Sequence, residues 1–114
     1  MIDAYQFGNI VIDGIPYTKD VIITTSGVQA DWWRKEGHKL QLEDIQSVID
    51  AARPKSLVVG TGKFGILKVN DSVKDYLESR KINLHAEPTD KAIKIYNRLF
   101  LIEKKVVGAF HLTC

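Results

Sequence analysis

A glycine-rich stretch that follows a short apolar run is the part of this sequence best suited to binding a ligand. Val58-Val59 leads into Gly60-Thr61-Gly62-Lys63-Phe64-Gly65, which matches G-x-G-x-x-G, the spacing of loops that hold a dinucleotide pyrophosphate. Such loops open directly into a helix whose amino end faces the phosphates. Here Ile66-Leu67-Lys68-Val69 intervenes before any helix signal, and 114 residues cannot hold two nucleotide-binding halves. The sequence therefore disfavours a dinucleotide site, and we expect no cofactor.

The same stretch has two other interpretations. A tight turn that leaves a buried strand would require Gly60 and Gly62, because a Cβ atom would clash there. Alternatively, successive backbone N–H groups form a concave site for a carboxylate or phosphate, and Lys63 adds positive charge. Loops at the carboxyl ends of parallel strands are where open α/β sheets bind ligands. We therefore expect a small anion-accepting pocket at Gly60–Gly65.

Aromatic, basic and sulfur-containing residues elsewhere extend this candidate site. Trp32-Trp33-Arg34 either supplies a stacking surface and an anion clamp or pins a long loop to the core. His111 and Cys114 form H-x-x-C, but no second cysteine or nearby histidine completes a tetrahedral set, so no metal site is expected. No G-x-S-x-G or H-E-x-x-H motif is present, and catalytic residues stay unassigned. The candidate ligand-binding residues are Gly60, Thr61, Gly62, Lys63, Arg34, Trp33 and His111.

The first part of the chain is rich in short strand signals. Apolar runs separated by turn residues predict four strands, at Ala4–Phe7, Ile10–Ile12, Ile15–Tyr17 and Val21–Thr25. Asp13-Gly14 between two of them predicts a type I′ hairpin turn, in which both central residues have positive φ. The segment Val28–Leu40 has no clear period, and we expect an ordered loop.

The rest of the chain alternates helices with strands. Apolar residues recur at helical spacing in three segments: Leu42, Ile45, Val48, Ile49 and Ala52, ended by Pro54; Val73, Tyr76 and Leu77, opened by Asn70 or by a Ser72/Asp75 capping box; and Ala92, Ile95, Tyr96 and Leu99. Strands are expected at Ser56–Val59, Ile82–Ala86 and Val106–Leu112. The sequence therefore predicts a single α/β domain over residues 1–114, with a mixed β-sheet, about three packed helices and a β-rich N-terminal part.

Composition and charge narrow the function classes. Apolar residues make up 45% and charged residues 26%, and no apolar run approaches a membrane span. We expect a cytoplasmic protein, because the start of the sequence has neither a signal peptide nor an import pattern. Residues 1–52 carry four Lys/Arg against eight Asp/Glu, whereas residues 53–114 carry twelve against six. Such a split can attract an anionic ligand or an acidic partner, but a solvated surface with uneven charges is the simpler interpretation. The lack of basic runs argues against nucleic acid.

Several motifs together resemble one small family. They are Trp33-Arg34 with Gly37-His38, Val58-Val59-Gly60-Thr61-Gly62, Thr89-x-x-Ala92-x-x-x-Tyr96-Asn97-x-Leu99, and Gly108-Ala109-Phe110-His111-Leu112-Thr113-Cys114. The chain resembles the family of the adipogenesis-associated domain-containing protein, a domain of unknown function that also includes a mitochondrial complex I assembly factor. The resemblance implies a compact α/β domain of a distinct fold with no established enzymatic activity. It implies a requirement for Gly60 and Gly62 but not for Gly65, which makes the G-x-G-x-x-G match a coincidence of spacing.

Two functions are consistent with these observations. The first is a non-catalytic binding or assembly module that contacts a protein partner, or a second copy of itself, through its polarised surface. The second is an enzyme or a small-molecule sensor that uses the pocket framed by Gly60–Gly65, Arg34 and His111. The missing catalytic constellation favours the first.

Overall fold

The N-terminal strands form a small antiparallel sheet of their own. In this computed structural model, which describes residues 1–103 and 105–114, β1 (Ile2–Gln6), β2 (Asn9–Ile12) and β3 (Ile15–Tyr17) pair in the order β1-β2-β3. Asp13 and Gly14 join β2 to β3 with φ values of 49° and 81°. The positive φ at both positions confirms the type I′ turn predicted from Asp-Gly.

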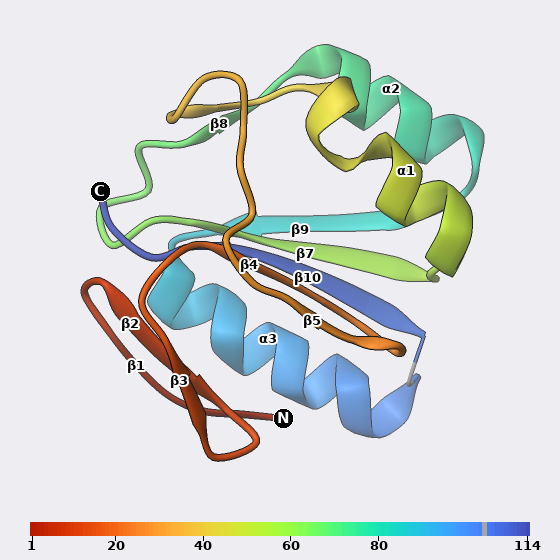
Figure 1. Cartoon of the computed structure of the whole chain (residues 1–114). Coiled ribbons are helices and arrows are strands. Elements are labelled where there is room, and N and C mark those ends of the chain that lie inside the picture. The colour runs from red at the N-terminus through yellow and green to blue at the C-terminus, as the bar shows by residue number, and fades with distance from the viewer. Residues whose placement is uncertain (104) are drawn as a thin grey trace.

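The main sheet has five strands in the order β5-β4-β10-β7-β9 (Figure 1). Their bounds are β4 Val21–Thr24, β5 Gly27–Gln29, β7 Ser56–Thr61, β9 Asn83–Glu87 and β10 Val106–His111. β10 runs antiparallel to β4 but parallel to β7, and β7 runs parallel to β9. The sheet is therefore mixed, as predicted, and its middle strand comes last in the described chain.

Helices cover both faces of this sheet, as Figure 1 shows. The helices α1 (Leu42–Ala52) and α2 (Asp71–Ser79) lie on one face, whereas α3 (Thr89–Ile102) and the β1–β3 sheet lie on the other. Alternating residues of β7 and β10 feed the two cores: Leu57, Val59, Val107 and Ala109 pack toward α1 and α2, and Val58, Val106 and Phe110 pack toward α3. Buried strands covered on both sides explain the nearly continuous apolar runs in the sequence.

The predicted boundaries of helices and strands need only small corrections. The Asn70 side chain accepts a hydrogen bond from the Ser72 N–H at 3.0 Å, so Asn70 opens α2 and the Ser72/Asp75 box does not. Strand boundaries differ from the predictions by one or two residues, and β10 ends at His111 rather than at Leu112. None of the described helices is long and apolar enough to cross a bilayer.

The segment Val28–Leu40 is ordered largely by one tryptophan. Trp32 is 5% exposed; its Nε1 donates to the Asp44 carbonyl at 3.1 Å and its backbone N–H to the Asp20 carbonyl at 2.8 Å. Trp33 is 76% exposed. The pinning role predicted for the tryptophan pair is therefore confirmed for Trp32. The expectation of a loop is wrong at both ends of this segment. Val28 and Gln29 belong to β5, and the last two residues form β6 (Lys39–Leu40), which pairs in parallel with β8 (Lys68–Val69).

Candidate functional site

Close packing explains the glycines at the end of β7. A Cβ atom on Gly60 would lie 2.8 Å from both Phe110 Cδ1 and Thr89 Oγ1, in the core on the α3 side. Gly62 has φ of +98°, and a Cβ atom there would lie 2.7 Å from the Thr113 carbonyl oxygen. Both positions therefore require glycine for steric reasons, whether or not a ligand binds.

The backbone amides of the loop between β7 and β8 are mostly used within the protein. Four of them donate to protein oxygens: Gly62 to Thr89 Oγ1 (2.9 Å), Lys63 to Thr113 O (2.8 Å), Gly65 to Gly62 O (3.3 Å) and Leu67 to Thr61 O (3.1 Å). The Lys63 ammonium lies 3.0 Å from the Asp90 carboxylate. The acceptors are the Thr89 side chain and the backbone carbonyls of Thr61, Gly62 and Thr113. These four N–H groups are therefore not free to form a nest that binds an anion.

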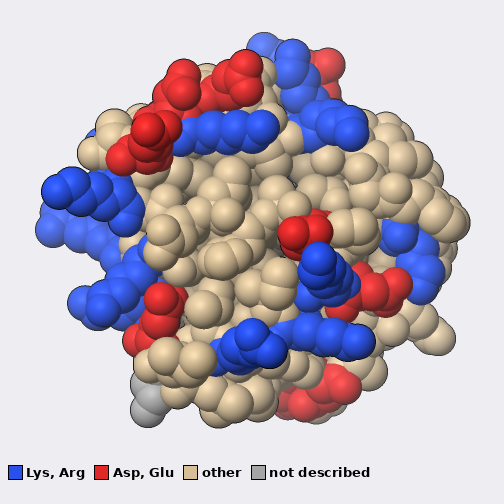
Figure 2. All heavy atoms as spheres, turned by 180° about the vertical axis from the view of Figure 1, so that it is seen from behind, with Lys and Arg blue, Asp and Glu red and all other residues tan. Residues whose placement is uncertain are grey.

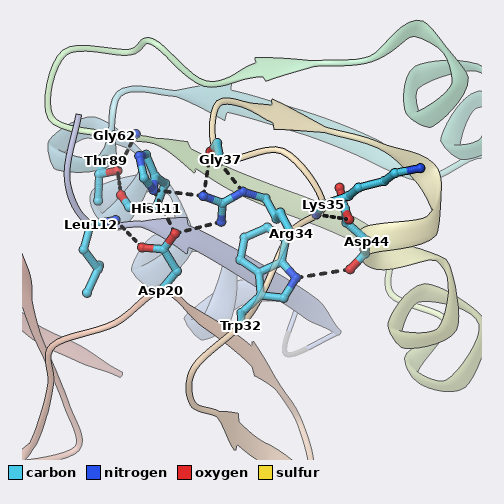
Figure 3. Close-up of polar contacts among 10 residues, drawn as sticks. All are labelled: Asp20, Trp32, Arg34, Lys35, Gly37, Asp44, Gly62, Thr89, His111 and Leu112. Carbon is cyan, nitrogen blue, oxygen red and sulfur yellow. Dashed lines mark hydrogen bonds and ion pairs between the residues drawn. The ribbon is translucent and has the colours of Figure 1, made fainter.

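The arrangement that most resembles a reactive site is formed by three polar side chains at the end of β10. They belong to Asp20, Arg34 and His111 (Figure 3). Arg34 Nη1 lies 2.7 Å from Asp20 Oδ2, and His111 Nδ1 lies 2.8 Å from the same oxygen. Arg34 Nη2 lies 3.1 Å from His111 Nδ1 and donates to the Gly37 carbonyl at 2.8 Å. The Leu112 N–H donates to Asp20 Oδ1 at 2.9 Å. This cluster joins the segment before β4, the tryptophan loop and the end of β10.

Hydrogen bonding sets the charge state within this cluster. Burial raises the pKa of the Asp20 carboxyl, but the hydrogen bonds from His111, from the Leu112 N–H and from Arg34 outweigh burial and hold that pKa below its usual value. An ionised Asp20 requires a proton on His111 Nδ1, because only a donor is stable 2.8 Å from a carboxylate oxygen. His111 Nε2 is buried without a hydrogen-bond partner among the described residues.

An Asp–His pair of this kind can orient a general base, but here the His111 ring is buried. His111 is 6% exposed, and the edge of its ring meets the His38 ring at 5.7 Å between centroids. Neither His111 nor Arg34 lies on the wall of the hollows beside α1, beside α2 or beside the glycine loop in the described part of the chain. The contacts of the cluster link three segments of the chain.

The structure separates the residues that the sequence grouped as one site. Arg34 and His111 are in contact, and Gly62 lies beside them, since a Cβ atom on it would be 2.9 Å from His111 Cδ2. Lys63 turns toward Asp90, and the exposed Trp33 lines a separate hollow beside α1. Sequence reasoning missed Asp20, which ends a turn segment; an acid directly before a buried strand was the available signal.

The H-x-x-C pair does not lie on one strand. Because β10 ends at His111, the alternation of side chains along a strand does not extend to Cys114, which is half-buried. Across residues 1–103 and 105–114, no group of three or more His, Cys, Asp and Glu side chains is arranged to hold a metal ion.

One hollow does adjoin the glycine loop. It has a volume of about 370 Å³ and is lined by Thr61, Phe64, Gly65, Leu67, Lys68, Val69, Lys74, Ala86 and Pro88. Its cations are Lys68 and Lys74, whereas Lys63 is not on its wall. Above this hollow the loop is strongly apolar, since Phe64 is 70% exposed and Ile66 is also exposed.

A doubly covered mixed sheet, a linked Asp–Arg–His cluster and a loop with exposed apolar side chains characterise this small α/β domain. Residues 2–111 match the family described as protein of unknown function (DUF498/DUF598), and the chain belongs to this family. The sequence-based expectation of a domain of unknown function is thereby confirmed.

Solved structures show the same fold. A conserved hypothetical protein from Pyrococcus horikoshii has 26% identity and a TM-score of 0.84, with 100% of this chain and 99% of that chain covered. A Bartonella henselae protein described as an outer membrane protein has 22% identity and a TM-score of 0.82, with 99% and 94% covered. A Bordetella pertussis protein described as an Mth938-like domain has 18% identity and a TM-score of 0.77, with 98% and 85% covered.

Proposed function

We propose that this domain is a non-catalytic binding module that contacts a protein partner through the loop between β7 and β8. The observation that carries this proposal is the orientation of that loop. Four of its N–H groups donate to protein oxygens, whereas the Phe64 side chain is 70% exposed. Exposed aromatic side chains on a pre-ordered loop are typical anchors of protein interfaces, because little entropy is lost on binding.

Two further observations support a binding role. Arg34 and His111 are buried, at 8% and 6% exposure, which favours a structural role for their cluster over a catalytic one. The resemblance to the adipogenesis-associated family, with its assembly-factor member, also favours contact with other proteins. Cytoplasmic location belongs to the same proposal.

Replacing Phe64 by serine should abolish partner binding without weakening the fold. The free energy of unfolding should change by less than about 0.5 kcal/mol, because an exposed side chain away from the core contributes little to stability. The test is affinity purification with quantitative mass spectrometry, using tagged wild type, Phe64→Ser and Leu101→Ser. Leu101→Ser is the control, because it removes a similarly exposed apolar residue on α3. We expect a protein that is enriched by wild type and Leu101→Ser and is at least about tenfold depleted with Phe64→Ser. Identical recovery by all three variants would refute the proposal.

A second candidate function follows from the hollow beside the loop. Its two lysines favour a small anion, as a ligand for a sensor or as part of a partner. Phosphate, sulfate or a small carboxylate should raise the melting temperature with millimolar affinity, about 4 kcal/mol of binding free energy, because the site is open. Lys68→Ala should remove the shift and Lys63→Ala should retain it, since Lys63 pairs with Asp90. Micromolar stabilisation by NAD or FAD would instead indicate a dinucleotide site.

A further inference from the structure

A second hollow lies at the opposite end of the parallel strands. It has a volume of about 470 Å³ and is bounded by the ends of α1 and α2 and by the residues that precede β7 and β9. Its lining is Ile49, Asp50, Arg53, Pro54, Arg80 and Ile82. Ile49 and Pro54 are buried and Ile82 is half-buried, so its floor is apolar and its rim is charged.

Positive charge gathers around this hollow. We call the set Arg53, Lys55, Arg80, Lys81 and Lys105 the basic end. Backbone hydrogen bonds hold its parts together, because the Lys55 N–H donates to the Lys105 carbonyl at 2.8 Å and the Asn83 N–H donates to the Lys55 carbonyl at 3.0 Å. Figure 2 shows Lys and Arg side chains gathered at the left-hand edge, the end at which these strands begin.

Two acids at this end have side-chain partners, and a third, Glu78, lies on the same hollow as Lys81. Asp50 accepts a hydrogen bond from Tyr76 and lies 3.7 Å from Arg80 Nε, and Glu103 accepts from Ser56 Oγ at 3.1 Å. The Arg80 guanidinium stacks over the Tyr76 ring at 3.8 Å, which holds its planar fork in place. Acids near the hollow therefore leave the basic end with excess positive charge.

Backbone geometry shows that two of these cations occupy costly positions. Arg53 directly follows α1, and Lys81 lies just beyond the end of α2. Their φ values of 47° and 58° lie in the left-handed region, where glycine is the least strained residue. A cation near the carboxyl end of a helix interacts favourably with the helix dipole, and this explains one of the cations at the end of each helix. Lys55 and Lys105 lie next to strands instead, and helix capping does not account for them.

We propose that the basic end binds an acidic peptide segment, with one apolar side chain of the peptide in the hollow and its carboxylates on the surrounding cations. The cations span the starts of three strands, which is wider than a single small anion covers. Exposed ion pairs contribute little affinity by themselves, so the apolar floor supplies affinity and the charges supply steering and specificity. This site is separate from the loop between β7 and β8.

The test is fluorescence anisotropy with a fluorescein-labelled oligoglutamate peptide that carries a central leucine. Arg53→Gly with Lys81→Gly removes two cations but suits the left-handed backbone, so the melting temperature should stay equal or rise. We expect this double variant to bind at least about tenfold more weakly than wild type. Lys91→Ala, an exposed cation on α3, and Phe64→Ser should bind as wild type does.

Variants of the peptide test the apolar anchor and the carboxylates separately. A peptide with serine in place of the leucine should bind several-fold more weakly, and a glutamine version should not bind. Equal binding by wild type and the glycine double variant would overturn the site. If the serine peptide binds as tightly as the leucine peptide, the apolar anchor is wrong. If free glutamate competes with the peptide, the basic end is a small-anion site instead. If single-stranded RNA binds more tightly than the peptide, the choice of partner is wrong.

Discussion

Replacing Trp32 by alanine should lower the free energy of unfolding by about 3–5 kcal/mol, the usual cost of truncating a buried tryptophan. The side chain fills the core between the sheet and α1, and its Nε1 bonds to the Asp44 carbonyl. Its ring also lies 4.7 Å from the Arg34 guanidinium carbon, so the truncation loosens the Asp20–Arg34–His111 cluster. Urea denaturation followed by far-UV circular dichroism measures the loss.

Trp33→Ala is the matched control for this experiment. It removes the neighbouring residue of the same type, but the side chain is exposed, and the change should be below about 0.5 kcal/mol. Equal denaturation midpoints for Trp32→Ala and wild type would show that the loop is held by other contacts.

Asp20→Asn should be about as damaging, at about 3–5 kcal/mol near neutral pH, because it leaves the buried Arg34 charge without its partner. The amide keeps the size of the side chain, so the loss reports on charge and hydrogen bonding rather than on a cavity. Asp31→Asn is the control: it removes one exposed acid, and asparagine tolerates the left-handed backbone of that position, where φ is 55°.

The pH dependence of this loss has a defined sign. The folded pKa of Asp20 lies below its unfolded value, so its stabilising effect is complete above the unfolded value of about 3.9 and disappears as pH falls through the folded pKa. The difference in unfolding free energy between wild type and Asp20→Asn should therefore shrink in acid. A difference that stays constant from neutral pH to about pH 3 would contradict the ionised state of Asp20.

Local chemistry made most of the fold predictable. Asp13-Gly14 specified its turn because few residue pairs accept positive φ twice, and the helical faces from Leu42 to Ala52 and from Ala92 to Leu99 followed from their apolar spacing. The two-residue strands β6 and β8 could not be predicted, because a pair so short has no periodicity.

The candidate site was less predictable, because its contacts join distant segments. Arg34 and His111 were selected for their chemistry, but their shared partner Asp20 is defined only once β10 lies beside β4. The amides of the glycine loop were expected to face a ligand. Two of their four acceptors, the Thr89 hydroxyl and the Thr113 carbonyl, come from segments whose position the local sequence does not encode.

The place of β10 has a consequence for how the chain folds as it is synthesised. Val106–His111 emerges after the other four strands of its sheet, yet it lies between β4 and β7. Until it arrives, β4 and β7 each present an open edge that can pair with another chain. The pairing of β4 with β10 also closes a long loop before any contact compensates for the lost entropy. We expect slow folding for a domain of this size and a nascent state that depends on protection from aggregation.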